Sequence, residues 1–519
     1  MGTRALCLTG TVAALLLAWA SPAFAVSKNV QFLDNLPAAK NATAINFLSY
    51  ADRSDVMLVT GRFGLKSYSL SDPAHPVLLD EITADDLRLT GDPPVDFSPD
   101  AAPRSTFWQN EDMDVDRQRK LVLISRDPRA YAGSTSREPG ETDPNGATNI
   151  AGVYIVDAKD PRRLRLLAFQ QLPTGHTTTC VNGCEALWTG GPASTTTQRD
   201  QLGWTFGRPI IVTDLTNPRK PVAHPMEPVD LFRRDGITAY SHDVQVDAAG
   251  IAWVSGDGGT RGYWTRGRHF DPVQERERAA TALDPIPYAG GGLPSTVTAD
   301  ETGGFEHNAW RPVGRSAPAG DPRYRDGELL LATEEDFGPP EEACSNRGKF
   351  SIASLEGSFD GEAWRSTPQN PFRLRVVGTW SPYQQEGSRP LGEYSPLANF
   401  CSAHYFDVDG STVTYAWYGE GTRFLDISDP ANPTQFAYWR PDDGIVWASY
   451  MYKGYVYTAD RTRGVDVLRL TTGATAAARA GREVVAPALS TRHRRFLSRQ
   501  AVRFKADPGT AYICIIETG

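Results

Sequence analysis

Long apolar runs are nearly absent from this chain of 519 residues. Beyond the N-terminus, no stretch approaches the roughly 18 uninterrupted apolar residues that indicate a membrane-spanning helix. Lys and Arg do not gather into the basic stripe that nucleic-acid binding requires, and the formal net charge is −9. We therefore expect neither a transmembrane segment in the mature chain nor a nucleic-acid partner.

The common catalytic signatures are missing as well. The chain has no G-x-S-x-G elbow of a serine hydrolase, no H-E-x-x-H zinc motif and no P-loop. A hydrolase with Glu111 or Glu334 as its base therefore has no supporting motif. Helical periodicity is also absent between residues 42 and 470, whereas 47 Gly and 38 Pro indicate many turns.

The N-terminus resembles an export signal. Arg4 precedes a largely apolar run from Leu8 to Ala20, and Ala23-Phe24-Ala25 forms an A-x-A cleavage site without a preceding twin arginine. Residues 1–25 are therefore predicted to be a Sec signal peptide that is removed after Ala25. We expect the mature protein to be secreted and extracellular.

Cysteine is scarce in the mature sequence. Cys180 and Cys184 flank Val-Asn-Gly, a hairpin turn, so an extracellular protein is expected to join them in a disulfide. A metal half-site of C-x-x-x-C type is the alternative, but no second cysteine pair completes it. Cys514 is left without an expected partner.

A strand opening recurs along the chain, clearest at His242–Asp247 and His404–Asp409. Further copies of this opening are expected to begin at Asn46, Glu111, His176, His307 and Ser449. The copies at 46, 111, 176, 242 and 307 are 65 or 66 residues apart, and a fixed period indicates a repeat architecture.

Each repeat continues into an apolar second strand, such as Leu121–Ser125, and most add a third strand before an Asp-Pro or Asn-Pro turn, such as Val153–Asp157. With a fourth strand per repeat, the pattern predicts an all-β, seven-bladed β-propeller of four-stranded blades. The seventh blade lacks a fourth strand of its own, and Val30–Leu33 is predicted to supply it and close the ring.

The third strands resemble those of the LVIVD-repeat family of secreted bacterial β-propellers. The resemblance covers roughly residues 42–470 and implies fold and export without a defined chemistry. Two repeats, around 262–304 and 349–380, lack the third-strand Asp-Pro turn, so their boundaries are the least defined. The propeller domain is assigned to residues 26–470.

Residues 471–519 are predicted to be a linker and a C-terminal tail with one helix. Leu489, Phe496 and Val502 fall near helical spacing, opposite a basic side. The helix is expected either to dock on the propeller or to attach to an anionic envelope surface.

The residues that open the first strands are the candidate functional site. First strands line the channel of a propeller, so these residues are expected to gather at one mouth. Imidazoles and a carboxylate there would suit a divalent transition metal, Zn, Cu, Fe or Mn. The five candidate ligands are Glu111, His176, His242, His307 and His404.

Acidic residues at the ends of the second strands are expected on the same face, where they could orient the imidazole rings. They are Asp257, Glu334, Glu335, Asp336 and Glu420. Cys344 and Cys401 are expected on this face in neighbouring blades, where a disulfide would fix a loop, although free thiols are the alternative. His75, His224, His269 and His493 fall outside the repeat and are expected at the surface.

The arrangement is weakly similar to the propellers of selenium-binding proteins and methanethiol oxidases, which implies a metal-using channel but carries over no individual residue. The structural alternative is that the histidines only hydrogen-bond within their blades, as in WD-type propellers. Two functions therefore stay open: a secreted, monomeric binding module for an extracellular ligand or protein, and a metal-dependent enzyme, an oxidoreductase.

Overall fold

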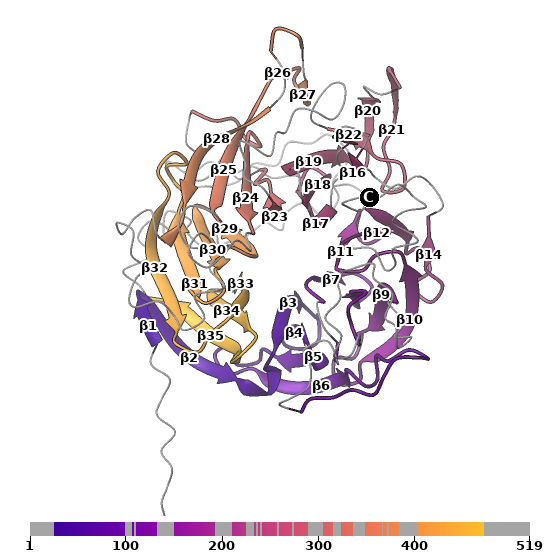
Figure 1. Cartoon of the computed structure of the whole chain (residues 1–519), viewed down its shortest axis with the longest axis vertical. Coiled ribbons are helices and arrows are strands. Elements are labelled where there is room, and N and C mark those ends of the chain that lie inside the picture. The colour runs from indigo at the N-terminus through magenta and orange to yellow at the C-terminus, as the bar shows by residue number, and fades with distance from the viewer. Residues whose placement is uncertain are drawn as a thin grey trace, which may run out of the picture.

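The protein is an all-β ring of seven blades around a central channel (Figure 1). This computed structural model describes residues 25–98, 106–107, 110–131, 150–191, 210–224, 233–234, 237–238, 241–256, 259–271, 274–288, 305–314, 323–335, 348–365, 367–370, 373–382 and 402–471. The predicted fold is confirmed. The expected tail helix, most of the expected signal peptide, and Asp257, Asp336, Cys344, Cys401 and Cys514 lie outside the described residues.

The first three blades are regular antiparallel sheets of four strands, with the first strand next to the channel. Blade one contains β3 (Ala42–Leu48), β4 (Val56–Gly61), β5 (Gly64–Ser69) and β6 (Val77–Thr83). Blade two contains β7 (Met113–Asp116), β8 (Leu121–Arg126), β9 (Ala151–Asp157) and β10 (Arg165–Leu172). Blade three contains β11 (Thr177–Val181), β12 (Ala186–Gly190), β13 (Ile211–Asp214) and β14 (Val222–Ala223), and a small hairpin, β15 (Arg233–Arg234) with β16 (Ile237–Thr238), follows.

Blades four and five each carry a hairpin inserted between the third and fourth strands, which explains why their boundaries were hard to read in the sequence. Blade four contains β17 (Ser241–Val246), β18 (Ile251–Gly256), β19 (Gly259–Trp264) and β22 (Ile286–Pro287), with the insert β20 (Arg268–Asp271) and β21 (Arg276–Ala279). Blade five contains β23 (Glu306–Trp310), β24 (Leu329–Glu334), β25 (Phe350–Glu356) and β28 (Arg373–Trp380), with the insert β26 (Ser358–Phe359) and β27 (Trp364–Arg365).

The N-terminus closes the ring, as the sequence predicted. Blade six contains β29 (Phe406–Asp409), β30 (Thr412–Ala416), β31 (Thr422–Asp426) and β32 (Thr434–Pro441). Blade seven contains β33 (Val446–Tyr452), β34 (Tyr455–Asp460) and β35 (Gly464–Leu470), and β2 (Val30–Leu36) supplies its outer strand. A short 3-10 helix, η1 (Pro37–Ala39), follows β2. In addition, β1 (Ala25–Lys28) pairs with β32 as an unexpected fifth strand of blade six.

The hydrophobic core lies between the blades. Second strands such as β4 and β8 are buried along their whole length, whereas every residue of the outer strand β6 except Ile82 is exposed or half-buried. Between blades seven and one, for example, Val59 of β4 packs in one cluster with Tyr457 of β34 and Val465 of β35. Stacked sheets of this kind hold the first strands, and therefore their side chains, in fixed positions around the channel.

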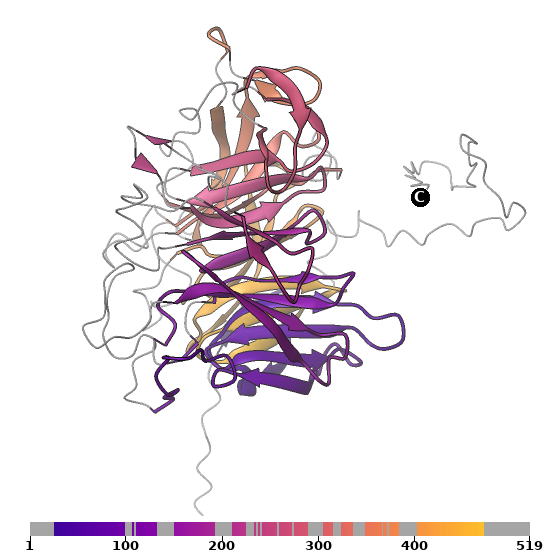
Figure 2. The same ribbon diagram turned by 90° about the vertical axis from the view of Figure 1, so that its right-hand side faces the viewer.

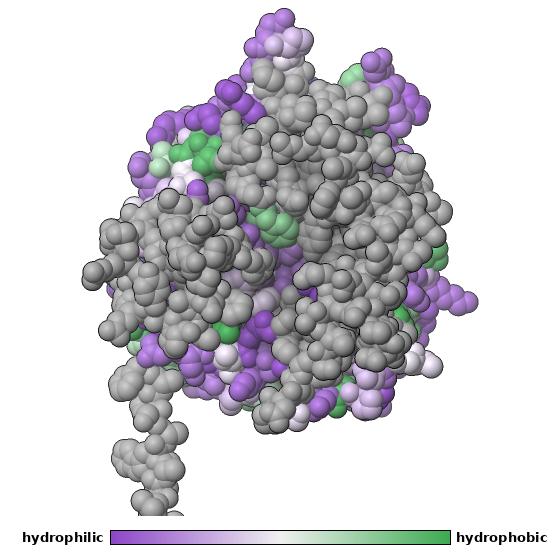
Figure 3. Space-filling view, in the orientation of Figure 1, coloured by the Kyte–Doolittle hydropathy of each residue, from purple (hydrophilic) through white to green (hydrophobic). Residues whose placement is uncertain are grey.

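The blades stack into a disc that is seen edge-on in Figure 2, and the described part of its rim in Figure 3 is mainly hydrophilic with separate hydrophobic patches. Exposed apolar side chains such as Phe32, Val77 and Phe359 come from different blades. No helix among the described residues is long and apolar enough to cross a membrane. One expected surface residue proves to be buried: the His269 ring stacks on Trp264 at 3.8 Å between centroids.

Candidate metal centre

The candidate ligands stand on a recurring irregularity of the first strands. In blades one, four, five and seven the pairing of the first with the second strand shifts by one residue, at Thr43, His242, His307 and Trp447. Such a β-bulge leaves one residue outside the ladder and re-aims its side chain. We call the seven equivalent positions the ring; they are Thr43, Glu111, His176, His242, His307, His404 and Trp447.

Two expected ring members were wrong. Asn46 follows the true ring position of blade one by three residues: its Oδ1 accepts the backbone N–H of Phe47, as Asp114 Oδ1 accepts that of Val115 in blade two. In blade seven the ring position is Trp447 and not Ser449. Neither blade has a His or Glu to mark the position, so an approximate period could not fix the register there.

All five candidate ligands meet in the channel. Glu111 Oε2 lies 3.1 Å from His176 Nε2 and 3.5 Å from His242 Nε2. The same oxygen lies 3.4 Å from His307 Nε2 and 3.6 Å from His404 Nε2. The two Nε2 atoms of His176 and His242 are 3.0 Å apart. Five side chains from five blades therefore converge on one point.

These distances fit a shared metal ion. Ligand atoms about 2.0–2.2 Å from one metal lie roughly 3 to 3.5 Å from one another, depending on the coordination geometry. Among the described residues, ligand atoms lie close enough to share one ion in three overlapping groups of three residues each. They are Glu111 with His307 and His404, Glu111 with His176 and His242, and His242 with His307 and Glu335.

Three of the four imidazoles present Nε2 to that point because their Nδ1 atoms are held by other groups. The Nδ1 acceptors are Asp127 Oδ2 for His176 at 2.8 Å, the His307 carbonyl for His242 at 3.2 Å, and the Trp447 carbonyl for His404 at 2.6 Å. Carboxylate and carbonyl oxygens only accept, so Nδ1 carries the hydrogen and a neutral ring keeps its lone pair on Nε2. This is the tautomer that a metal needs.

The electrostatics of the ring favour one positive charge near Glu111. Burial opposes an imidazolium at His176, but Glu111 and Asp127 outweigh it and raise the pKa of His176 to about 9. Burial and then the neighbouring His404 lower the pKa of His307 to about 3. Burial and its histidine neighbours also lower the pKa of His242 far below the usual value. His242 and His307 are therefore neutral imidazoles, whereas His176 carries the positive charge that Glu111 and Asp127 attract.

Several acids were expected to orient the imidazoles, and among those that the structure describes only Glu335 lies at the ring. Glu335 Oε2 is 3.9 Å from His307 Nε2, and its Oε1 is 3.8 Å from His404 Nε2 and accepts from the Tyr418 hydroxyl. Burial and then Glu111 raise the pKa of Glu335 well above its usual value. By contrast, Glu334 accepts from the backbone N–H of Gly348, at 3.1 Å.

The Glu420 carboxylate likewise does not orient an imidazole but forms an ion pair with Arg423, at 2.7 Å. A further acid at the end of a second strand, Asp127, holds His176 and is in turn bound by Arg129. Asp127 directly follows β8, as Glu335 directly follows β24, so the two acids occupy equivalent strand ends.

The expected bridge between Cys180 and Cys184 is present, with the Cα atoms 4.4 Å apart. It closes the hairpin between β11 and β12, at the far end of β11 from His176. The turn requires left-handed backbone at Asn182, Gly183 and Cys184, where φ is 51°, 65° and 64°. The disulfide therefore braces the blade that carries His176 and leaves the ring untouched.

Comparisons with known proteins assign no function to this chain. No family model and no curated protein matches the chain. Among solved structures, the β-propeller domain of Myceliophteria thermophila Cps50 (Swd1) is 9% identical, with a TM-score of 0.43 over 85% of this chain and 100% of its own. The periplasmic gluconolactonase of Pseudomonas aeruginosa is 10% identical, with a TM-score of 0.39 over 76% of this chain and 85% of its own.

A third similar structure is the extracellular domain of a hybrid two-component system of B. thetaiotaomicron. It is 10% identical, with a TM-score of 0.40 over 84% of this chain and 39% of its own. All three neighbours are too distant to carry a function to this chain. The LVIVD resemblance consequently rests on the third-strand motifs.

Proposed function

We propose that this propeller is an exported, metal-dependent oxidoreductase with one divalent transition metal at the ring. The observation that carries the proposal is the approach of four imidazole Nε2 atoms to within 3.6 Å of one carboxylate oxygen. The ligands would be Glu111, His176, His242, His307 and His404, and the ion Zn, Cu, Fe or Mn. The Cys180–Cys184 disulfide supports an oxidising, extracellular location.

The donor set favours a catalytic over a purely structural ion. Structural zinc sites are closed by four ligands in a tetrahedron, whereas five donors converge here. Imidazole with carboxylate suits Fe, Cu and Mn as well as Zn, and the first three can change oxidation state. When bound, such an ion would supply electron transfer to or from a substrate at the channel mouth.

The chain's own residues would set up this site. Asp127 and the Trp447 carbonyl keep the rings of His176 and His404 turned toward Glu111. The Tyr418 hydroxyl donates a hydrogen bond to Glu335. The aromatic ring of Tyr418 packs against the imidazole of His404, with 4.9 Å between the centroids. This acid–phenol pair is positioned to exchange a proton at the edge of the ring.

A binding module that needs no metal is also compatible with a β-propeller, and one experiment separates the two. The protein is exported from a native-like host, and its metal content is measured by elemental analysis. We expect about one transition metal per chain, loss of that metal in His242→Ala and His404→Ala, and a spectroscopic change on adding a reductant.

The exposed residue His75 provides the matched control, since His75→Ala should keep the metal. Metal-free protein whose stability is unchanged by the ring substitutions would refute the metal centre and leave the binding module. Zinc alone would refute redox chemistry. If a ring variant fails to fold, the unmodified protein is treated with a chelator instead. Adding the metal back must then restore the midpoint of thermal unfolding.

A further inference from the structure

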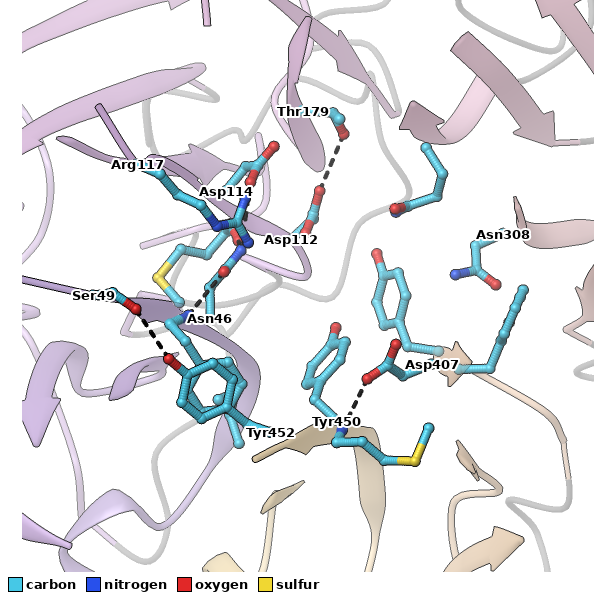
Figure 4. Close-up of a pocket in the computed structure, with 17 residues that line it drawn as sticks. Asn46, Ser49, Asp112, Asp114, Arg117, Thr179, Asn308, Asp407, Tyr450 and Tyr452 are labelled. Atoms are coloured by element: carbon cyan, nitrogen blue, oxygen red, sulfur yellow. Dashed lines mark hydrogen bonds between the residues drawn. The ribbon is translucent and has the colours of Figure 1, made fainter. Parts of the chain in front are cut away.

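A cavity of about 360 Å³ lies in the channel next to the ring, on the side toward which the first strands run (Figure 4). Its walls come from the same first strands, at positions that follow the ring residues. Asp112 follows Glu111, Asn308 follows His307, and Tyr405 follows His404 along the chain. The cavity is therefore a second level of the channel, distinct from the five metal ligands, and none of them lines it.

Acidic side chains outnumber basic ones at the cavity. Asp112, Asp114 and Asp407 line it, against one guanidinium, from Arg117. Arg117 is exposed to solvent. A fourth acid, Asp243, lies behind the wall, where its Oδ2 accepts from the amide of Gln245 at 3.0 Å. A positively charged occupant is favoured where acidic groups are gathered in this way.

A buried hydroxyl gives independent evidence for an occupant. Tyr405 lines the cavity and is 2% exposed, and its hydroxyl has no hydrogen-bond partner among the described residues. Its ring is fixed by packing against His307 at 4.6 Å and His404 at 4.8 Å between centroids. A buried polar group without a partner is destabilising, and a ligand with N–H donors would supply the missing hydrogen bond.

The carboxylates of the cavity do not cluster in the way that the metal ligands of the ring do. Asp114 Oδ2 accepts the backbone N–H of Cys180 at 2.7 Å, and Asp407 Oδ2 accepts that of Met451 at 2.8 Å. Each of these two carboxylates is thus tied to the next blade around the ring. No group of three potential metal ligands among the described residues includes a carboxylate of the cavity. This arrangement favours an occupant that extends from one carboxylate to another.

The remaining wall suits an alkyl chain. Tyr450 and Tyr452 line the cavity, and Tyr452 stacks on Phe47 with 4.1 Å between ring centroids. Aromatic faces attract ammonium groups and cover methylene groups. We propose that the cavity binds an organic dication of the aliphatic diamine class, with its ammonium groups on the carboxylates and its chain along the tyrosines.

Calorimetric titration of the full-length exported protein with 1,4-diaminobutane tests this proposal. We expect saturable binding at one site, and at least tenfold weaker binding of 1,4-butanediol, which has the same length without charge. Equal binding of the diol would overturn the proposal in favour of a polyol, and failure of the diamine to bind would overturn it outright. Displacement of the diamine by an equal concentration of Ca²⁺ would indicate an inorganic ion instead.

Two variants locate the binding. Asp112→Asn should weaken the diamine at least tenfold, and Tyr405→Phe, which keeps the ring, should weaken it severalfold. Tyr455→Phe is the matched control, since Tyr455 lies in β34, the second strand of blade seven, and does not line the cavity. Unchanged affinity in Tyr405→Phe would place the diamine elsewhere and overturn the proposal, even if Asp112→Asn fails to fold. Diamine binding does not require the metal, so failure of the metal proposal would leave this proposal standing.

Discussion

The ring and the cavity are built from ionisable residues of the same first strands, yet they differ in how those residues are held. At the ring, four imidazole Nε2 atoms lie within 3.6 Å of one carboxylate oxygen, Glu111 Oε2. In the cavity, Asp114 and Asp407 stay with the ladder and bind backbone amides of the next blade. Convergence favours a single ion, whereas dispersed charge favours an extended ligand.

The largest expected effect is on metal content. His307→Ala removes one of the converging donors, and we expect the metal per chain to fall at least tenfold in elemental analysis. The comparison variant Asp407→Asn, at the cavity level, should keep the metal. A His307→Ala protein that is folded by circular dichroism and still loaded with metal would contradict the assignment of the ring.

The second effect is on metal affinity and concerns Asp127, which is hydrogen-bonded to the ligand His176 but is not itself a metal ligand. Asp127→Asn keeps the shape but weakens the hydrogen bond to His176 Nδ1, and we expect metal affinity to drop about 10- to 100-fold. Competition with a coloured chelator measures this change. Glu334→Gln is the control, since its carboxylate accepts from the backbone of Gly348, and equal losses in both variants would argue against a specific role of Asp127.

The third effect is on stability. Asp407 accepts backbone N–H groups from Val408 and, across the blade interface, from Met451, both at 2.8 Å. Asp407→Ala leaves both donors without this acceptor and should cost about 1–3 kcal/mol in the free energy of unfolding by urea. A transition midpoint equal to that of the unmodified protein would mean that this carboxylate does not join the blades.

The smallest effect tests the independence of the two levels. Loading the ring with metal adds positive charge near the cavity, so diamine affinity should fall by no more than a few-fold. Titration of the metal-loaded and chelated protein gives the ratio. Complete loss of diamine binding on metal loading would mean that both ligands compete for one site.

Much of the architecture was predictable from local patterns. Blade count, second strands such as Leu121–Arg126 and closure by Val30–Leu36 follow from alternation, turn residues and the need to cover a strand edge. The fifth strand of blade six, Ala25–Lys28, was not predicted, because it overlaps the expected cleavage site and is too short to stand out. The inserted hairpins of blades four and five were missed because they interrupt the repeat.

The ring ligands were predicted as a group because His at a recurring position is conspicuous in a chain with eight histidines. Their neighbours were harder to predict. Thr43 and Trp447 carry no chemistry that marks their position, and the register there became visible only through the bulges. Asp127 and Glu335 look alike in the sequence, and only the fold shows that one holds Nδ1 of His176 while the other faces Nε2 of two histidines.

By itself, the sequence determined the propeller and the identity of the five candidate ligands, because strand periodicity and residue type are local properties. The tertiary structure decided that their ligand atoms converge, that three imidazoles are held in the tautomer for metal binding, and that carboxylates a few residues further along are kept apart. Those outcomes depend on β-bulges and on hydrogen bonds between blades, which join residues about 65 positions apart in the chain.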